Sequence, residues 1–514
     1  MFISPKKICL ILTLAATLPL ANLTATRAEE PTAIKSVITT PLEPIAVATN
    51  GGKHATRVQT LILPQNAKLE QINLTVSNPA LVDRIEARIG STVIGEEEEV
   101  TEKTAVVVDA EVVAKALEGV QNCDLWLIPN YPVDIDQKLC VNVTSCQLNG
   151  VDAPCERHEL EYRLAALVRE SGWDSVARYR IPGIARTNKG TLVAVYDARY
   201  NGWPDLPANI DVMCSRSFDN GNTWTPMATV FDFHGQDEAL EGVGDPMILV
   251  DPTNDRIWVA ALWAHNGKST AASEPNLVFG TSGRLVLTYS DDQGETWAEP
   301  RDITNDAAPN SSWRLLFQGP GNGIAMRDGT LVMPAQFIDK DKVWHSTLVV
   351  SHDHGETWSV GTGARKMTCE SQVVELNNGD IMINMRNFSG HARSVATTSD
   401  FGQTWQEDPS SCKALIEPIC QASLIRVFST EDGDDANLLA FMNPNDERSR
   451  INMTIQLSED EGQTWPRALT LYRPGGAGYS CLVKIDVATL GALYENSSGG
   501  LIFQRVKLEE IPQR

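Results

Sequence analysis

Short runs of alternating hydrophobic and polar residues recur along most of the chain, separated by turns rich in Gly, Asn and Asp. Two lie early, at Val58–Leu63 and Ile72–Val76, and later examples include Leu192–Tyr196, Leu331–Gln336 and Ile381–Met385. A period of two places every second side chain on one face of a β-strand, and the runs are too short for helices. The pattern therefore predicts an all-β protein.

A longer pattern, Ser/Thr-x-Asp-x-Gly-x-Thr-Trp, occurs five times at intervals of 47 to 73 residues. Within it, Asp can accept bonds from the backbone of a tight turn, Gly supplies a positive φ, and Thr-Trp restarts a strand. A catalytic site needs unlike residues that converge once, so we interpret the repeated Asp and Trp residues as structural. The copies are Ser217–Trp224, Ser290–Trp297, Ser351–Trp358, Thr398–Trp405 and Ser458–Trp465.

These patterns divide the chain into parts. Residues 171–510 hold all five motifs, and about 55 residues per unit suits the four strands of a propeller blade. We therefore predict a six-bladed β-propeller, in which one blade lacks the motif, rather than a sandwich or a parallel β-helix. Residues 30–155 lack the motif and are typical of a small β-sandwich. Residues 156–170 are rich in charge and are predicted to be a linker.

Residues 1–28 have the organisation of a secretory signal peptide. Lys6 and Lys7 precede an apolar stretch around Ile8–Leu20, and small residues follow up to Ala28. This apolar run is short for a membrane anchor. We expect an exported protein, secreted or periplasmic, without a membrane span.

The composition narrows the partners. A net charge of −23 argues against nucleic acid and anionic membranes, which both require a positive surface. No CxxC or HExxH pattern occurs, so no metal or other cofactor is predicted. In an oxidising compartment, one or two disulfides are expected within the cluster of Cys123, Cys140, Cys146 and Cys155. Another can form between Cys412 and Cys420.

The repeated turns, together with Tyr179-Arg-Ile-Pro182 ahead of the first, resemble the sialidase (neuraminidase) family over residues 171–510. The resemblance implies an exo-α-sialidase that releases terminal sialic acids from glycoproteins, glycolipids or oligosaccharides, in oligosaccharide and ganglioside catabolism. Its partner is then a sialylated glycan. The N-terminal region resembles, less specifically, the β-sandwich domain of some bacterial sialidases. The sequence leaves open whether that domain binds glycans, self-associates or braces the propeller.

The family grips the carboxylate of sialic acid with three arginines from different blades. Arg180 and Arg386 match the first two, and Arg450 matches the third, with Arg448 as a nearby alternative. A guanidinium group pairs bidentately with a carboxylate and stays charged at any relevant pH. Glu495 resembles a late Glu that steadies the first arginine, here Arg180.

The resemblance places the general acid on a loop that follows Tyr196–Arg199. Asp205 matches it, and the alternative, Asp197, lies at a strand end where it would orient Arg199. To protonate a leaving oxygen near neutral pH, Asp205 needs a raised pKa, which loop closure over the sugar can provide. Arg199 resembles a residue that contacts the O4 side of the sugar. Asp245 matches an Asp that lines the same pocket, or else it initiates a turn before Pro246.

The nucleophile implied by the resemblance is Tyr479, with Glu370 as the base that takes its proton. Most retaining glycosidases attack with Asp or Glu, and sialidases are the exception. The anomeric carbon of sialic acid bears a carboxylate. This group would repel an anionic nucleophile 4 Å away by about 4 kcal/mol at an effective dielectric constant of about 20. A neutral phenol avoids this repulsion but needs a base, because its pKa is about 10. A Tyr packed beside a Gly-rich turn is the structural alternative.

Other readings stay open at this point. A trans-sialidase, or an intramolecular one that forms an anhydro sugar, would use the same residues. A non-catalytic sialic-acid-binding propeller would lack one of them. Three tryptophans outside the motifs can line the sugar pocket or pack in the core, namely Trp258, Trp263 and Trp344.

Overall fold

The computed structural model describes residues 36–37, 44–48, 53–64, 66–109, 122–155, 161–233, 241–270, 272–309, 311–476 and 478–514. These residues form strands and turns almost throughout, so the all-β prediction is confirmed. Within these ranges, the one α-helix is the four-residue α2 (Thr304–Ala307), and none is long and apolar enough to cross a bilayer. The predicted signal peptide, residues 1–28, lies outside the described residues.

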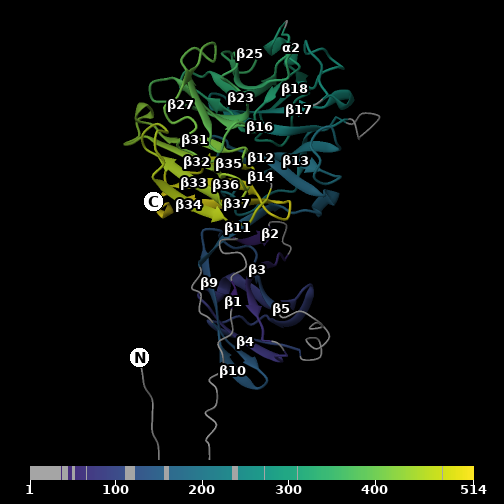
Figure 1. Cartoon of the computed structure of the whole chain (residues 1–514), viewed down its shortest axis with the longest axis vertical. Helices are drawn as coiled ribbons and strands as arrows, with labels where there is room; N and C mark the ends of the chain where they lie inside the picture. Colours follow the sequence, from purple (N-terminus) through teal and green to yellow (C-terminus); the bar gives the residue numbers. More distant parts are fainter. Residues whose placement is uncertain are drawn as a thin grey trace, which may run out of the picture.

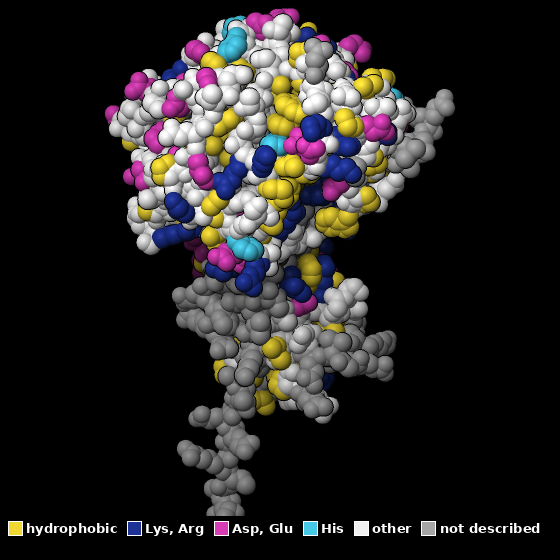
Figure 2. Space-filling view, turned by 45° about the horizontal axis from the view of Figure 1, so that its top comes forward, with side chains coloured by type: hydrophobic (Ala, Val, Ile, Leu, Met, Phe, Trp, Pro, Cys, Tyr) yellow, Lys and Arg dark blue, Asp and Glu magenta, His cyan; other side chains and the backbone are white. Residues whose placement is uncertain are grey.

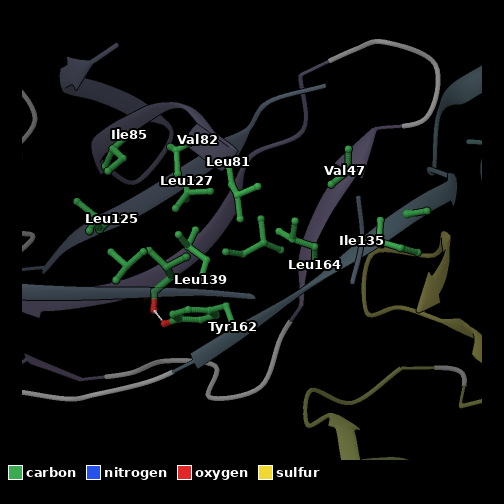
Figure 3. Packing of buried hydrophobic residues seen from close by; sticks show 14 of the residues in the cluster. Val47, Leu81, Val82, Ile85, Leu125, Leu127, Ile135, Leu139, Tyr162 and Leu164 are labelled. Carbon is green, nitrogen blue, oxygen red and sulfur yellow. Dashed lines mark hydrogen bonds between the residues drawn. The ribbon is translucent and has the colours of Figure 1, made fainter. Parts of the chain in front are cut away.

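The N-terminal part is a sandwich of two sheets, as predicted (Figure 1). One sheet has the order β1-β3-β8-β5-β6, and the other contains β9-β4-β7 with β10 beside β9. Figure 3 shows Ile85 and Leu125 of the first sheet facing Leu139 and Tyr162 of the second. The strands are β1 (Ser36–Val37), β2 (Ile45–Ala48), β3 (Thr56–Ile62), β4 (Leu69–Val76), β5 (Val82–Ile89), β6 (Thr92–Glu97), β7 (Lys103–Val107), β8 (Asn122–Pro129), β9 (Lys138–Leu148) and β10 (Val151–Pro154), with a 3₁₀ turn at Pro79–Leu81.

Five further sheets follow along the chain, and β35–β37 complete the propeller as part of the nine-stranded sheet that also contains β9-β4-β7. Figure 1 shows them around a common centre, and their inner strands contact one another in turn until β35 meets β12. The first three sheets contain β12 (Arg178–Arg186), β13 (Leu192–Arg199), β14 (Ile210–Ser217) and β15 (Ala228–Phe231); β16 (Val243–Asp251), β17 (Arg256–Trp263), β18 (Arg284–Ser290), β19 (Arg301–Asp302) and β21 (Gly321–Asn322); and β20 (Leu315–Gln318), β22 (Ile324–Ala325), β23 (Leu331–Ile338), β24 (Trp344–Ser351), β25 (Ser359–Val360) and β26 (Arg365–Lys366).

The remaining sheets are more regular. They contain β27 (Thr368–Glu375), β28 (Ile381–Asn387), β29 (Ser394–Thr398) and β30 (Gln406–Glu407); β31 (Ser423–Phe428), β32 (Leu438–Pro444), β33 (Met453–Ser458) and β34 (Arg467–Tyr472); and β35 (Ser480–Lys484), β36 (Thr489–Glu495) and β37 (Leu501–Lys507). Short 3₁₀ turns occur at Trp173–Ser175, His265–Gly267, Thr430–Asp432 and Leu508–Glu510.

The predicted linker is wrong for residues 161–169, which form strand β11 (Glu161–Arg169). Its first residues pair with β9 of the sandwich, whereas Ala166–Arg169 pair with β37 of the last propeller sheet. Over this stretch β37 pairs with one edge of β11 and the parallel strand β2 with the other. Residues 164–169 are all buried, because successive side chains pack alternately into two neighbouring hydrophobic cores. One continuous hydrophobic core therefore joins the two parts.

The expected disulfides are also absent. All nine described cysteines are free thiols. The Sγ atoms of Cys146 and Cys155 lie 3.6 Å apart, in hydrogen-bonding contact but unlinked. Cys412 is exposed, whereas Cys420 is buried beneath Tyr479, so these two thiols occupy different environments.

The hydrogen bonds among the first Ser or Thr, the Asp, the Gly and the second Thr of the repeated motif are the same in every copy, whereas the partner of the Trp indole N–H differs between copies. In the third, the Ser351 hydroxyl donates to the Asp353 carboxylate at 2.7 Å and accepts from the Gly355 N–H at 2.8 Å. Asp353 also accepts from the Thr357 N–H at 2.9 Å and the Thr357 hydroxyl at 2.6 Å. The Trp358 indole N–H then donates to the Gly355 carbonyl at 3.0 Å. We call these five segments the repeat turns.

Each repeat turn begins where the third strand of a sheet ends, at β14, β18, β24, β29 and β33. The last sheet has no such turn because its fourth strand, β11, comes from upstream in the chain. An eight-residue strand spans about 26 Å. The repeat turns therefore lie a full strand length from the opposite edge of the ring, where the predicted site residues are found.

We predict that Asp353→Ala lowers stability without changing activity. Removing the carboxylate leaves Ser351 and Thr357 without their acceptor, which should cost about 1 kcal/mol, because water replaces these bonds at the surface. In a protein of 514 residues that unfolds as one unit, this corresponds to a fall in Tm of about 1 °C. Differential scanning calorimetry of the parent and the variant measures it.

Asp341→Ala is the matched control, because the Asp341 side chain is exposed and contacts only Lys340 beside it. The difference in Tm between the parent and Asp353→Ala should also depend on pH. Partial desolvation acts to raise the pKa of Asp353, but the bonds from Thr357 and Ser351 dominate and lower it to about 2. The stabilisation is therefore present above the unfolded pKa near 4 and disappears as the pH falls toward 2. An equal effect at pH 2 and pH 7 would contradict this account.

Candidate active site

A cavity of about 240 Å³ lies at the edge of the ring opposite the repeat turns. The structure brings seven of the predicted residues together around it, from five different sheets. They are Arg180, Asp205, Asp245, Glu370, Arg386, Arg450 and Tyr479. Arg199 and Glu495 lie immediately behind this lining and bond to it. In Figure 2, Lys and Arg side chains gather near the middle of the visible propeller face, with Asp and Glu mostly toward its outline.

Irregularities in the inner strands aim several of these side chains. The pairing register shifts between Arg180 and Gly183 in β12, between Gly244 and Met247 in β16, and between Thr368 and Ser371 in β27. Ile181 and Asp245 adopt φ values of 57° and 58° at the first two. A β-bulge re-aims the side chains around it. The bulges thus place Arg180, Asp245 and Glu370 at the cavity.

Glu495, at the end of β36, holds the first and last sheets together. Its Oε1 accepts from Arg180 Nε at 3.1 Å and from the Ile181 N–H at 3.0 Å. Its Oε2 accepts from the Tyr479 N–H at 2.9 Å. The side chains of Glu495 and Arg180 are only 1% and 9% exposed. One buried carboxylate therefore fixes both Arg180 and the backbone of Tyr479.

The Tyr479 hydroxyl lies between an acid and a base. It donates a very short hydrogen bond to Glu370 Oε1 and accepts one from Arg386 Nη1 at 3.0 Å. Arg386 Nη1 also donates to Glu370 Oε2 at 2.6 Å. Burial, together with the charge of Glu370, raises the pKa of Tyr479 well above 10, although Arg386 opposes this. The phenol is therefore neutral in the free protein, with a proton acceptor already in contact.

Asp205 is 80% exposed and lies on the loop after β13. Its Oδ1 accepts from Arg199 Nη1 at 2.6 Å and lies 3.5 Å from Arg180 Nη1. Desolvation acts to raise the pKa of Asp205, but the neighbouring Arg199, helped by Arg180 and Arg450, lowers it below its ordinary value. The raised pKa that a general acid needs is therefore absent from the free protein.

Asp197, the alternative acid, is buried and does not line the cavity. Its Oδ2 accepts from Arg199 at 2.8 and 3.0 Å, so it orients Arg199, and its Oδ1 accepts from the Asp245 N–H at 2.9 Å. Burial raises the pKa of Asp197 to about 6. Desolvation and the Asp197 carboxylate raise the pKa of Asp245 well above 4. Asp245 therefore lines the cavity as a carboxyl group whose surroundings favour its protonated form.

The structure distinguishes Arg450 from its alternative Arg448 and shows where the three tryptophans lie. Arg450 lines the cavity with its guanidinium 5.8 Å from the Tyr479 ring, whereas Arg448 is exposed on the preceding turn. Of the three tryptophans, Trp344 lines the cavity. Trp258 is buried in the core between the second and third sheets, and Trp263 stacks on Phe233.

Several lining residues were not predicted from the sequence. They form an apolar and neutral polar wall around the charged groups. Ile181, Leu206 and Cys369 each adjoin a predicted residue along the chain. This adjacency is the one sequence signal that could have indicated them. The wall consists of Ile181, Leu206, Leu262, Thr270, Phe317, Gln336, Cys369 and Phe388, in addition to Trp344.

Comparison with known proteins gives consistent matches. A family model for a BNR repeat-like domain matches residues 190–490. The chain is 42% identical over 388 residues to a sialidase from Bacteroides fragilis (strain YCH46), and the match covers 73% of this chain and 71% of that protein. The solved structure of Hadza microbial sialidase Hz136 superimposes with a TM-score of 0.83 at 33% identity, covering 93% of this chain and 100% of that one.

A more distant structure shares the fold. The intramolecular trans-sialidase from Ruminococcus gnavus, in complex with oseltamivir carboxylate, superimposes with a TM-score of 0.59. It is 18% identical, and the match covers 68% of this chain and 98% of that one. At this identity the similarity extends to the fold alone.

We predict that Glu495→Gln destabilises the protein by about 3 kcal/mol, because it leaves Arg180 buried without its ion-pair partner. The amide also replaces one of two oxygens that accept backbone bonds. Urea unfolding followed by tryptophan fluorescence measures the loss.

Asp291→Asn is the matched control, since Asp291 pairs bidentately with Arg256 at the surface. This exposed pair should contribute less than about 1 kcal/mol. Equal losses in the two variants would show that Glu495 does not hold the ring together as described.

Proposed function

Because the chain belongs to the sialidase family of glycoside hydrolases, we propose that it releases terminal sialic acids with retention of configuration, through a covalent intermediate on Tyr479. The observation that carries this proposal is the Tyr479 hydroxyl, held between Glu370 and Arg386 in an arginine-lined cavity. The substrates would be sialylated glycoproteins, glycolipids or oligosaccharides.

Recognition starts with the carboxylate of the sugar. Arg180, Arg386 and Arg450 line one cavity and can surround a single anion. Each guanidinium group can pair with the carboxylate through charge-assisted hydrogen bonds, which are bidentate where the geometry allows. This recognition would orient the anomeric carbon toward Tyr479.

Binding would also prepare Asp205 as the general acid. In the free protein Asp205 is ionised, because Arg199 and Arg180 stabilise its charge. A sugar carboxylate on Arg180 would neutralise part of that positive field, and the sugar would exclude water from the loop. Both changes favour the protonated acid and raise its pKa. Asp205 could then protonate the leaving oxygen.

Attack by Tyr479 would require its proton to move to Glu370, which already accepts the hydroxyl hydrogen bond. Arg386 donates to the same oxygen and would stabilise the negative charge that develops on it. The phenolate oxygen forms a bond to the anomeric carbon as the bond to the leaving oxygen breaks. A water molecule would then attack the anomeric carbon while the ionised Asp205 takes one of its protons. The bond between the sugar and Tyr479 breaks, and Glu370 returns its proton to the departing phenolate.

We predict that Tyr479→Phe lowers kcat/KM on a fluorogenic α-sialoside by at least about 1,000-fold, because no nucleophile remains. Tyr131→Phe is the matched control, since Tyr131 is exposed in the N-terminal domain. Unchanged hydrolysis by Tyr479→Phe would refute the nucleophile. An inactive parent on all α-linked sialosides would instead favour a sugar-binding propeller.

The pH profile tests the role of Asp205. The acid must be protonated, so kcat/KM should fall as the pH rises through the pKa of Asp205 in the free enzyme, which is lowered. The fall in kcat, which reports the enzyme–substrate complex, should occur at higher pH. Asp205→Asn should abolish the fall with rising pH in both kcat/KM and kcat. The variant should also lose less activity on substrates whose leaving group departs without protonation than on substrates that need the acid. Coincident limbs for kcat and kcat/KM would contradict the proposed rise in pKa.

Product analysis separates hydrolysis from transfer. We expect ¹H NMR of a sialoside reaction to show free sialic acid first as the α-anomer, because two displacements retain configuration. An anhydro sugar, or a sialylated acceptor, as the initial product would identify an intramolecular or an intermolecular trans-sialidase instead.

A further inference from the structure

A second cavity, of about 780 Å³, is larger than the candidate active site. It lies between the outer parts of the second and third sheets, next to α2 and β25, which Figure 1 shows together at one end of the propeller. We call it the outer groove. Its size falls within the range of small-molecule sites, about 300–1,000 Å³. No step of the proposed reaction uses it.

Three parallel aromatic rings form one wall of the outer groove. Trp313 stacks on Phe337 with ring centroids 3.7 Å apart and planes 7° apart, and Phe337 stacks on His345 at 4.6 Å and 7°. His345 Nε2 contacts Asp339 Oδ2 at 3.1 Å, and Asp339 also accepts two backbone N–H bonds. The stack is thus held rigidly by the third sheet.

The facing wall is made of backbone and hydroxyl groups from residues 359–363. A Cβ on Gly363 would lie 2.7 Å from His345 Nδ1, and one on Gly361 would lie 2.8 Å from the Gly402 carbonyl. Gly363 therefore lets the backbone approach the His345 ring closely, whereas Gly361 lets it pack against the backbone of Gly402. The exposed Ser359 adds a hydroxyl group, while the Thr362 hydroxyl donates to the Gly402 and Gln403 carbonyls.

The charge of the outer groove limits its ligand. No Lys or Arg occurs among the described residues that line it, and Asp339 is acidic. An anion would therefore find no counter-charge there, unlike in the active site, which has three arginines. A purely apolar ligand would leave the hydroxyl and backbone groups unpaired. We propose that the outer groove binds a neutral sugar, with its apolar face on the aromatic wall and its hydroxyls on the opposite wall.

The register of the third sheet relates the groove to the active site. Gln336 and Trp344 line the catalytic cavity, whereas the next residues, Phe337 and His345, line the groove. Neighbouring side chains of a strand point to opposite faces. The two sites therefore lie on opposite faces of one sheet.

The binding test uses lactose and does not depend on catalysis. Saturation-transfer-difference NMR and titration calorimetry on the full chain should detect millimolar binding. Trp313→Ala, which removes the outer ring, and Ser359→Trp, which fills the groove from an exposed position, should each weaken it at least fivefold. Asp205→Asn should bind lactose as the parent does, because Asp205 is exposed at the other site and its change leaves the buried Arg180–Glu495 pair intact.

Each outcome decides the proposal. Loss of lactose binding in both groove variants, with unchanged Tm in Ser359→Trp, supports it. Undetectable binding to the parent at 50 mM lactose, or equal binding by both variants, overturns it. A glycan array in which the groove variants lose only anionic glycans would overturn the neutral class. If sialidase activity failed while lactose bound as stated, the proposed function alone would be refuted.

Discussion

The buried pair of Arg180 and Glu495 is the interaction on which the rest of the site depends. It joins the innermost strand of the first sheet to the middle strand of the last, so it lies where a ring of sheets must close. The same carboxylate also holds the backbone of Ile181 and of Tyr479. A buried pair contributes little net stability, but its geometry is demanding because both charges must be satisfied. Closing the ring and fixing the backbone of Tyr479 are therefore one event.

The functional groups form two coupled networks rather than a set of independent residues. One runs from Glu495 through Arg180 to Asp205, and the other from Glu370 through Tyr479 to Arg386. In both, an arginine stabilises the ionised partner while no sugar is present. A ligand that carries its own carboxylate would redistribute these charges. In the free protein Asp205 is thus deprotonated, whereas Tyr479 is protonated.

Much of this organisation could be predicted from the sequence. The period of two and the five motifs carry local information, since a turn with Asp, Gly and Trp forms from its own eight residues. The sheets of the ring and the structural role of the repeat turns followed from that. The resemblance supplied unlike residues in a fixed order, and the structure brings them around one cavity. Long-range features could not be predicted in this way. The strand character of residues 161–169 depends on β37, more than 300 residues away, and the pKa of Asp205 depends on arginines that only the folded ring brings near. The triple stack of the outer groove likewise unites residues whose sequence spacing carries no signal.

The origin of β11 has a consequence for how the protein is made. The outer strand of the last sheet is synthesised before the first sheet, yet its partner β37 follows more than 300 residues later. During synthesis, one edge of β11 therefore stays unpaired until β37 has been added, and such non-local pairing is slow. A chain that stops before β36 and β37 has neither the closed ring nor the carboxylate of Glu495. Such a chain exposes a strand edge that is buried in the folded protein and holds no assembled site.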